Sequence, residues 1–266
     1  MTVLAALALA GCAAPAEERA ADGLPTIVSL NPCADAILTE VAAPGQLLAI
    51  SHYSHSPRAS SMEPEVAARF ASTGGTAEEV IALSPDIVVG DIFMPPSTRA
   101  ALEAAGLRVE TLGIAGTLEE SHAQVRQLAT IAGDAAAGEA LVSRIDDAWS
   151  NAAFDGQAVD TLLWQEGGIV PGDTSLAAKL LQHTGFASHS AARGLGQGAY
   201  LPLEQVIADP PQLVLASGHE RMLTHPVLSD MNNVRYESFD SNLLYCGGPT
   251  IPRALARLGE IRASFP

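Results

Sequence analysis

Residues 78–89 read EEVIALSPDIVV, and residues 204–215 read EQVIADPPQLVL. The two stretches align without a gap and share Glu, Val, Ile, Ala, Pro and Val. In each, an acidic residue and an apolar pair precede a proline, which cannot continue a helix, and a run of aliphatic residues follows. This pattern predicts a short helix that leads into a buried strand. Because the copies lie too far apart for a solenoid repeat, we expect two α/β lobes of related construction.

The composition is typical of a globular protein with an acidic surface. The 266 residues are 48% hydrophobic but only 5% aromatic, which predicts aliphatic packing between helices and sheets. The chain has 14 basic and 30 acidic residues, giving a net charge of -16. Binding to nucleic acid requires a basic surface, so we expect no nucleic-acid partner.

The first residues are typical of a bacterial lipoprotein signal. An apolar run at Val3–Ala10 leads into LAGC at 9–12, the pattern at which such signals are cut and the cysteine is acylated. The run is too short to span a bilayer. We therefore expect a signal peptide at 1–11, a lipid anchor on Cys12, a tether to residue 24 and a periplasmic location. A plain secretory signal is the alternative, and the lack of Lys or Arg ahead of the run leaves a start upstream of Met1 open.

From residue 25 onwards, strand and helix patterns alternate. Four strands joined by short connections, typical of a parallel sheet, are predicted at 26–30, 46–50, 86–90 and 107–112. Two helices follow, at 118–132 and 135–153, and the second is long enough to cross between lobes, at roughly 28 Å. Strand and helix patterns then resume at residue 161. The predicted boundaries are an N-terminal lobe at 25–117, connecting helices at 118–153 and a C-terminal lobe at 154–266.

Four further motifs, together with the repeat, point to one protein family. They are SLNP at 29–32, LLAISHYSHSP at 47–57, the repeated units that end in SPDIVV and PPQLVL, GDTSLAAKLLQHTGF at 172–186, and PRALARL at 252–258. Together they resemble the periplasmic binding proteins for iron complexes and vitamin B12, most closely the vitamin B12 branch. The resemblance implies two Rossmann-like lobes joined by a single long helix, with a ligand cleft between them. It also implies a monomer that is not an enzyme, has no cofactor and delivers its ligand to the dimeric permease of an ABC importer.

The resemblance also assigns a role to the repeated glutamates. In that family a glutamate on each lobe docks with basic pockets of the permease, and the matching residues are Glu78 and Glu204. A two-fold permease requires two equivalent anions, which agrees with the repeat. Glu79 is the rival in the first lobe. The structural alternative is that these carboxylates only complement the dipoles of the helices that they begin.

Ligand-binding candidates lie in loops that follow strands, because ligands of α/β sheets bind beyond the carboxyl ends of the strands. The candidates are Asn31, Cys33, His52, Tyr53, Trp164, His219, Arg221, Tyr245 and Cys246. Tyr53 and Trp164 offer flat apolar faces that suit a macrocycle. His52 and His55 have the spacing HxxH, a weak metal-site pattern, so we expect no direct metal site.

The resemblance places Cys33 and Cys246 beside the cleft, on opposite lobes. In an oxidising compartment a disulfide forms if the Cα atoms approach within about 7 Å. Three states stay open at this point: a disulfide, contact of the thiols with a ligand metal, and two unpaired thiols, which we favour.

The expected function is capture of a metal chelate, either cobalamin or a ferric siderophore. Anionic siderophores usually require several basic residues in the cleft. The only basic residues available here are Arg58, Arg99, Arg193, Arg221 and Arg253, which favours a neutral corrinoid. Haem and free Zn or Mn ions are the alternatives. An α/β enzyme is a remote alternative, because the chain has no GxxxxGK, HExxH or GxSxG motif.

Overall fold

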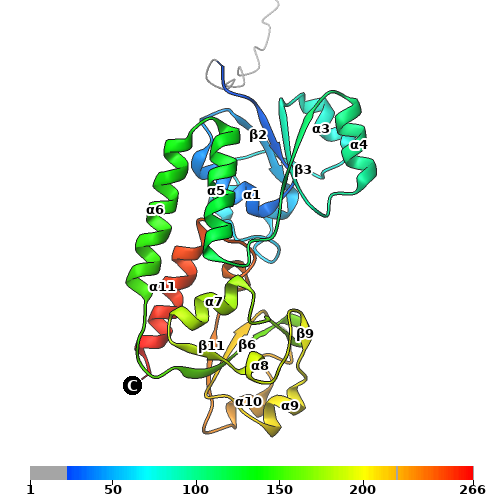
Figure 1. The fold of residues 1–266 in the computed structure, drawn as a ribbon. Coiled ribbons are helices and arrows are strands. Elements are labelled where there is room, and N and C mark those ends of the chain that lie inside the picture. The colour runs from blue at the N-terminus through cyan, green and yellow to red at the C-terminus, as the bar shows by residue number, and fades with distance from the viewer. Residues whose placement is uncertain (1–22, 220, 266) are drawn as a thin grey trace, which may run out of the picture.

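The structure is a computed structural model that describes residues 23–219 and 221–265. The predicted signal peptide, the lipid anchor at Cys12 and nearly all of the tether lie outside these residues. Two lobes are stacked one above the other, and each contains a parallel sheet (Figure 1). The α/β fold class is therefore confirmed, whereas the exact lobe boundaries stay predictions.

The N-terminal sheet has the strand order β3-β2-β1-β4-β5, and all its strands are parallel. The strands are β1 (Ile27–Ser29), β2 (Leu47–Ser51), β3 (Ser72–Thr73), β4 (Ile87–Asp91) and β5 (Arg108–Leu112). The helices of this lobe are α1 (Pro32–Val41), α2 (Pro64–Ala67), α3 (Ala77–Leu83) and α4 (Pro96–Ala104), with a short 3-10 turn, η1 (His52–His55). Alternate strand residues pack on opposite faces: Ile87 and Val89 face α1 and α5, whereas Val88 faces α3 and α4.

The C-terminal sheet has the order β11-β10-β6-β8, again fully parallel. Its strands are β6 (Val159–Gln165), β8 (Phe186–Ser188), β10 (Leu213–Ser217) and β11 (Arg235–Ser238), and a separate antiparallel ribbon pairs β7 (Ile169–Val170) with β9 (Ala199–Tyr200). The helices are α7 (Leu176–His183), α8 (His189–Ala192), α9 (Leu203–Ala208), α10 (Pro226–Ser229) and α11 (Thr250–Ala263), with 3-10 turns η2 (Glu166–Gly168) and η3 (Ser241–Leu243).

The sequence repeat corresponds to a repeat in the fold. The order β2-β1-β4-β5 of the first sheet matches β8-β6-β10-β11 of the second, so the units α3-β4 and α9-β10 occupy equivalent places. Even a side-chain contact is repeated. Asp86 accepts a hydrogen bond from the backbone N–H of Thr26 at 2.7 Å, and its aligned residue Gln212 accepts one from the N–H of Asp160 at 2.9 Å. The prediction of two related lobes is confirmed.

The two helices predicted at 118–132 and 135–153 are present as α5 (Leu118–Ala132) and α6 (Ala135–Ala152). Gly133, at φ 84°, ends α5, and the Asp134 side chain caps α6 by accepting from the N–H of Ala137. Helix α6 runs along one side of the molecule from the upper lobe to the lower one, beside α11 (Figure 1). Its apolar face, which includes Leu141 and Ile145, is buried in a core that both lobes share. In the described part of the chain, no helix has the length and apolar character needed to cross a membrane.

A buried carboxyl group fixes the turn η1 to helix α1. Asp35 is fully buried, and its Oδ2 accepts hydrogen bonds from the Ser51 N–H at 2.9 Å and the Ser54 hydroxyl at 2.5 Å. Its Oδ1 has no hydrogen-bond partner among the described residues. Burial raises the pKa of Asp35 to about 7, although hydrogen bonds from neighbouring serines act in the opposite direction.

We expect the free energy of unfolding to fall by about 2 to 3 kcal/mol between pH 5 and pH 8 because of Asp35. The pKa of this group is raised on folding, so its contribution to stability is fully present below the unfolded pKa of 3.8 and is lost as the pH rises through about 7. Asp35→Asn, which cannot ionise, should remove this decline in urea unfolding at the two pH values. An equal decline in the variant would assign the pH dependence to other groups.

Candidate functional site

A cleft of about 420 Å³ lies between the two lobes and takes its walls from both. On the N-terminal side it is lined by the last residues of β4 and β5, Asp91 and Leu112, and on the C-terminal side by the last residue of β6, Gln165. The carboxyl ends of parallel strands are the usual binding position in α/β sheets, so this cleft is the candidate site.

Asn31 and Asp91 hold the N-terminal wall in place. Asn31 Oδ1 accepts from the backbone N–H groups of Cys33 and Ala34 and so caps α1, while its Nδ2 donates to Asp91 Oδ2 at 3.2 Å. Asp91 Oδ1 accepts from the N–H of Phe93 at 2.7 Å. This network orients Phe93, which lines the cleft and is 71% exposed. An exposed aromatic ring at a cleft is free to pack on a ligand.

The other polar groups of the cleft are mostly carboxamides. Gln124 donates to the carbonyl of Gly113 at 2.8 Å, and Gln197 accepts from the N–H of Gly172 at 2.9 Å, so both side chains fix loops at the rim. The Gln165 side chain has no hydrogen bond to another described residue and remains available to a ligand. Tyr245 donates its hydroxyl to the carbonyl of Arg58 at 2.6 Å, which leaves the lone pairs of the phenol oxygen free.

The lining carries almost no charge. Among the described residues that form it there is no Lys, Arg or His, and Asp91 is the one carboxylate. Thr174 and Ser175 add hydroxyl groups, and the apolar surface comes mainly from Phe93, Leu112, Ile114, Leu176 and Leu244. This arrangement suits a ligand with a large apolar face and neutral hydrogen-bonding groups, and it does not compensate negative charge.

Cys33 and Cys246 form a disulfide, with their Cα atoms 5.2 Å apart. Our preference for two unpaired thiols is therefore wrong. Both cysteines line the cleft as predicted, but the bond excludes thiol contact with a ligand metal. Cys33 lies on α1, and Cys246 lies just before α11, where Gly248 packs against Ile37 of α1. The bond thus joins two segments at the base of the cleft that are far apart in sequence.

Trp164 does not face a ligand, so this part of the predicted site is wrong. The side chain is fully buried, and its Nε1 donates to the carbonyl of Leu201 at 3.0 Å. The reason is the period of two along β6: Trp164 shares a face with Leu162 and packs in the core beneath α9. The neighbouring residue, Gln165, reaches the cleft instead.

The other predicted site residues divide into two groups. Asn31 and Tyr245 line the cleft. Four other ligand-binding candidates are exposed but do not line the cleft, namely His52, Tyr53, His219 and Arg221. The same is true of His55, the weak metal candidate. The Tyr53 ring packs against His52, with ring centroids 4.1 Å apart. Gln124, Gln197 and Leu176 also line the cleft and were not predicted from the sequence, although Leu176 lies in the segment at 172–186 that carries the family resemblance.

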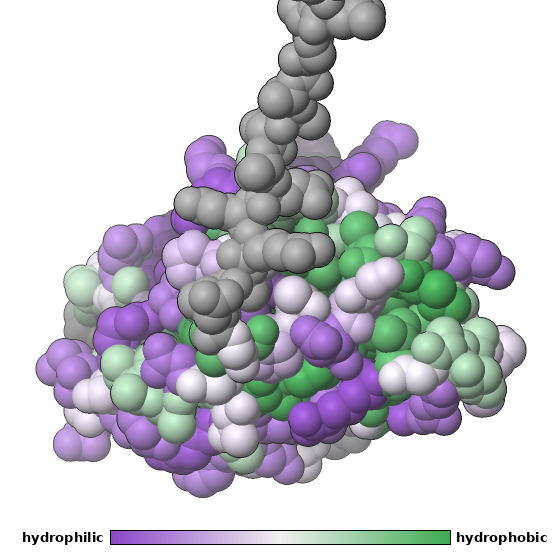
Figure 2. Space-filling model, turned by 90° about the horizontal axis from the view of Figure 1, so that it is seen from above, coloured by the Kyte–Doolittle hydropathy of each residue, from purple (hydrophilic) through white to green (hydrophobic). Residues whose placement is uncertain are grey.

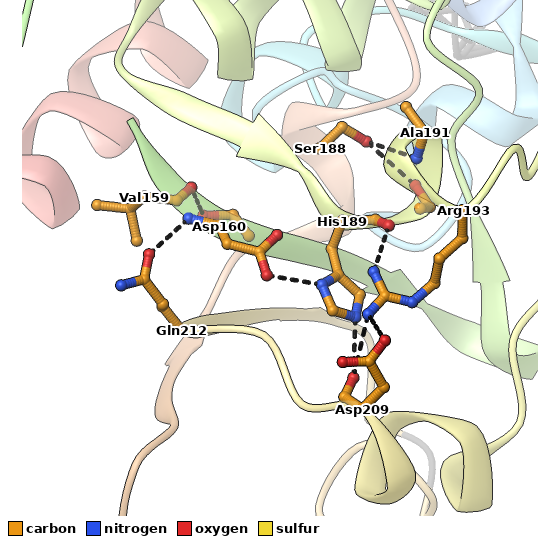
Figure 3. Close-up of polar contacts among 10 residues, drawn as sticks. Val159, Asp160, Ser188, His189, Ala191, Arg193, Asp209 and Gln212 are labelled. Carbon is orange, nitrogen blue, oxygen red and sulfur yellow. Dashed lines mark hydrogen bonds and ion pairs between the residues drawn. The ribbon is translucent and has the colours of Figure 1, made fainter. Parts of the chain in front are cut away.

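A second polar cluster lies in the C-terminal lobe, centred on the buried side chain of His189 (Figure 3). The ring Nδ1 lies 2.8 Å from Asp160 Oδ2, and Nε2 lies 3.1 Å from the carbonyl oxygen of Asp209. Both partners are hydrogen-bond acceptors, so an N–H on either ring nitrogen has an acceptor in place. Arg193 donates to the carbonyl of His189 at 2.8 Å and pairs with the Asp209 carboxylate. Since Asp209 ends α9, the cluster fixes the position of that helix.

The sequence of residues 27–241 matches the family described as "Periplasmic binding protein". The chain belongs to the periplasmic binding protein family. Among curated proteins, none matches the chain. A periplasmic haem-binding protein from Roseiflexus sp. RS-1 is similar in structure, with 21% identity, a TM-score of 0.71 and coverage of 91% of this chain and 98% of that one.

Two further structures similar to this periplasmic binding protein come from Vibrio cholerae. A haem-binding protein has 18% identity, a TM-score of 0.71 and coverage of 91% of this chain and 99% of its own. A vitamin B12-binding protein has 19% identity, a TM-score of 0.67 and coverage of 91% and 98%. At these identities the likeness establishes the fold alone, and the family membership establishes a binding role in transport.

Proposed function

We propose that this periplasmic binding protein captures a neutral or cationic corrinoid in the interlobe cleft and delivers it to the permease of an ABC importer. The observation that carries the proposal is the composition of the cleft, which combines apolar walls and carboxamides with a single carboxylate and no cation. The protein acts by binding and release, without catalysis and without a cofactor of its own.

The charge of the cleft separates the candidate ligands. Ferric siderophores with net negative charge, and haem with its two propionates, lose hydration on binding and require cationic partners to offset that loss. A corrinoid carries neutral carboxamide groups around its ring, and each can both donate and accept hydrogen bonds. Gln165 and Gln197 present matching groups, and Phe93 presents an apolar face. The cleft is partly open to solvent, so a ligand larger than 420 Å³ can project from it.

Haem is the second candidate, favoured by one feature of the cleft. Tyr245 lines the cleft, and tyrosinate is a known axial ligand of ferric haem; in that role the Tyr245 oxygen would give up its hydrogen bond to the carbonyl of Arg58. The haem-binding proteins of similar fold lend it further support. Free Zn or Mn ions gain no such support, because no group of three or more His, Cys, Asp or Glu side chains suited to a metal ion occurs at residues 23–219 and 221–265.

Isothermal titration with cyanocobalamin, cobinamide, haem and an anionic ferric siderophore, at one ionic strength, tests the assignment. We expect a corrinoid to bind at one molecule per chain, at least about tenfold more tightly than haem or the siderophore, which corresponds to about 1.4 kcal/mol. Tyr245→Phe should leave corrinoid affinity unchanged. Tighter haem binding, together with an altered haem absorption spectrum in Tyr245→Phe, would replace the corrinoid by haem.

Export and membrane anchoring are part of the proposal. The apolar run and the LAGC motif support cleavage before Cys12 and acylation of that cysteine, and the Cys33–Cys246 disulfide is of the kind found in oxidising compartments. We expect the mature protein to be a lipid-anchored monomer. The molecular mass of the mature protein purified from membranes, compared with that of the Cys12→Ala variant, measures the lipid directly.

A further inference from the structure

The Cys33–Cys246 disulfide ties the end of the C-terminal sheet to the N-terminal lobe. After β11 the chain enters η3, which packs against α11 and buries Leu243. Only Leu244 and Tyr245 separate Leu243 from Cys246. Cys33, on the other side of the bond, belongs to α1, which packs on the N-terminal sheet. A link of two residues and one covalent bond therefore joins the two lobes.

This link is also part of the cleft wall. Leu244, Tyr245, Cys246 and Gly247 line the cleft, and so does Cys33. The bond holds the Cα atoms of the two cysteines 5.2 Å apart. An intact disulfide does not allow this separation to exceed about 7 Å, so the two walls cannot move apart at this point while the bond exists.

Groups that shape the site are attached to both cysteines. On one wall, the Cys33 N–H donates to Asn31 Oδ1 at 2.8 Å, and the Asn31 amide donates to Asp91. On the other wall, Tyr245 directly precedes Cys246. A displacement of either cysteine therefore moves polar groups that line the cleft.

The non-covalent contacts at this junction are weaker than the bond. The Gly248 N–H donates to the buried Ser121 hydroxyl at 2.7 Å, and Arg253 donates to the carbonyl of Ser61 at 2.7 Å. Packing is incomplete, because Ser61 and Arg253 line a second cavity of about 110 Å³ and the Ser61 hydroxyl has no hydrogen-bond partner among the described residues. These contacts can keep the lobes together without the disulfide, but hydrogen bonds exchange with water and leave the walls free to shift.

We propose that the Cys33–Cys246 disulfide is a positioning element of the ligand site and makes ligand affinity depend on the redox state of the protein. In the oxidised protein the bond holds both walls at the spacing that the ligand requires, so little freedom is lost on binding. In the reduced protein the ligand must order the walls itself, which lowers its affinity. This inference rests on the proposed function in one respect, namely that the ligand occupies the cleft.

Reduction by a dithiol follows ordinary thiol–disulfide exchange. A thiolate of the reductant attacks Sγ of Cys33, which is partly exposed whereas Cys246 is buried. The sulfur–sulfur bond breaks, Cys246 leaves as a thiolate and Cys33 carries a mixed disulfide. The second thiol of the reductant then displaces Cys33 and closes a cyclic disulfide. Two electrons pass from the reductant to the protein, and the two protons of its thiols complete the two cysteine thiols.

The test is isothermal titration of the full mature protein with cyanocobalamin, or with haem if the parent prefers haem, in the oxidised state and in excess dithiothreitol. We expect about tenfold weaker binding in the reduced state. The reduced protein keeps both sulfur atoms, so the loss reports the bond and not a missing contact. Oxidation with oxidised glutathione should restore the affinity. Cys33→Ser with Cys246→Ser should bind as weakly as the reduced parent, with and without reductant, which also shows that the reductant does not act on the ligand.

The matched control is Leu102→Ala, which lowers stability away from the bond. Leu102 is fully buried on α4, in the cluster with Val28 and Val88 on the sheet face opposite α1. Seen from above, this half of the N-terminal lobe also carries apolar residues at its surface, with hydrophilic residues around them (Figure 2). The cavity left by a buried leucine destabilises a protein about as much as loss of a disulfide. We expect unchanged ligand affinity in this variant.

The outcomes separate the inference from the function on which it rests. Equal affinity of the oxidised and reduced parent, with reduction verified by thiol titration, would overturn the positioning role and leave the ligand assignment intact. An equal loss of affinity in Leu102→Ala would also overturn it, because lower stability alone would then weaken binding. Failure of the oxidised parent to bind either ligand would overturn the proposed function as well.

Discussion

Replacement of Glu78 and Glu204 together by alanine should abolish uptake through the importer and leave ligand affinity unaltered. Both carboxylates are exposed, lie in the first turns of short helices and are not part of the cleft lining. Loss of one partner from an interfacial charge pair commonly costs about 2 to 5 kcal/mol, so the double variant should lose far more than either single one. Transport of labelled ligand into cells or proteoliposomes measures the effect.

Glu79→Ala is the matched control for this experiment. The Glu79 carboxylate accepts from the Thr73 hydroxyl at 3.0 Å, so it is occupied within the lobe, and its counterpart in the repeat is the neutral Gln205. We expect its removal to have little effect on uptake. Normal uptake in the double variant would place docking elsewhere and leave the repeated glutamates with only their interaction with the helix dipoles.

The second large effect is expected from the disulfide. Cys33→Ser with Cys246→Ser should lower the free energy of unfolding by about 2 to 5 kcal/mol, because the bond closes a loop with a sequence separation of 213 residues and so restricts the unfolded chain. Urea unfolding of the parent protein, with and without reductant, and of the double variant measures this difference.

The reductant supplies the control. Reduced parent protein should match the double variant, and the variant itself should not respond to reductant. An unchanged midpoint on reduction would mean that the bond adds no stability, whatever its position at the cleft.

The repeat is the part of the fold that was easiest to predict from the sequence. Its proline ends a helix and its aliphatic run forms a buried central strand, and both effects are local, so α3-β4 and α9-β10 were predicted close to their observed bounds. The helices α5 and α6 were equally easy to predict, because Gly133 and Asp134 carry the signals that end one helix and begin the next.

The site was harder to predict from the sequence, because it depends on which way side chains point and on which distant segments meet. Trp164 and Gln165 are adjacent at the end of β6, and only the sheet decides which one is buried and which one faces the cleft. Cys33 and Cys246 are brought together by the contact between α1 and the segment before α11, which no local pattern encodes. The strand-end rule did place Asn31 and Tyr245 at the cleft, and their contact with a ligand stays a prediction.

The central claim is that the interlobe cleft holds the ligand, and a variant that fills the cleft tests it most directly. Ala115 lies in the loop between β5 and α5 and lines the cleft, whereas Ala100 is exposed on α4 and does not. In isothermal titration with cyanocobalamin or cobinamide, we expect one ligand per parent chain, at least about 100-fold weaker binding to Ala115→Trp and unchanged binding to Ala100→Trp. Full affinity in the folded Ala115→Trp variant would contradict the account, because the ligand would then bind outside the cleft.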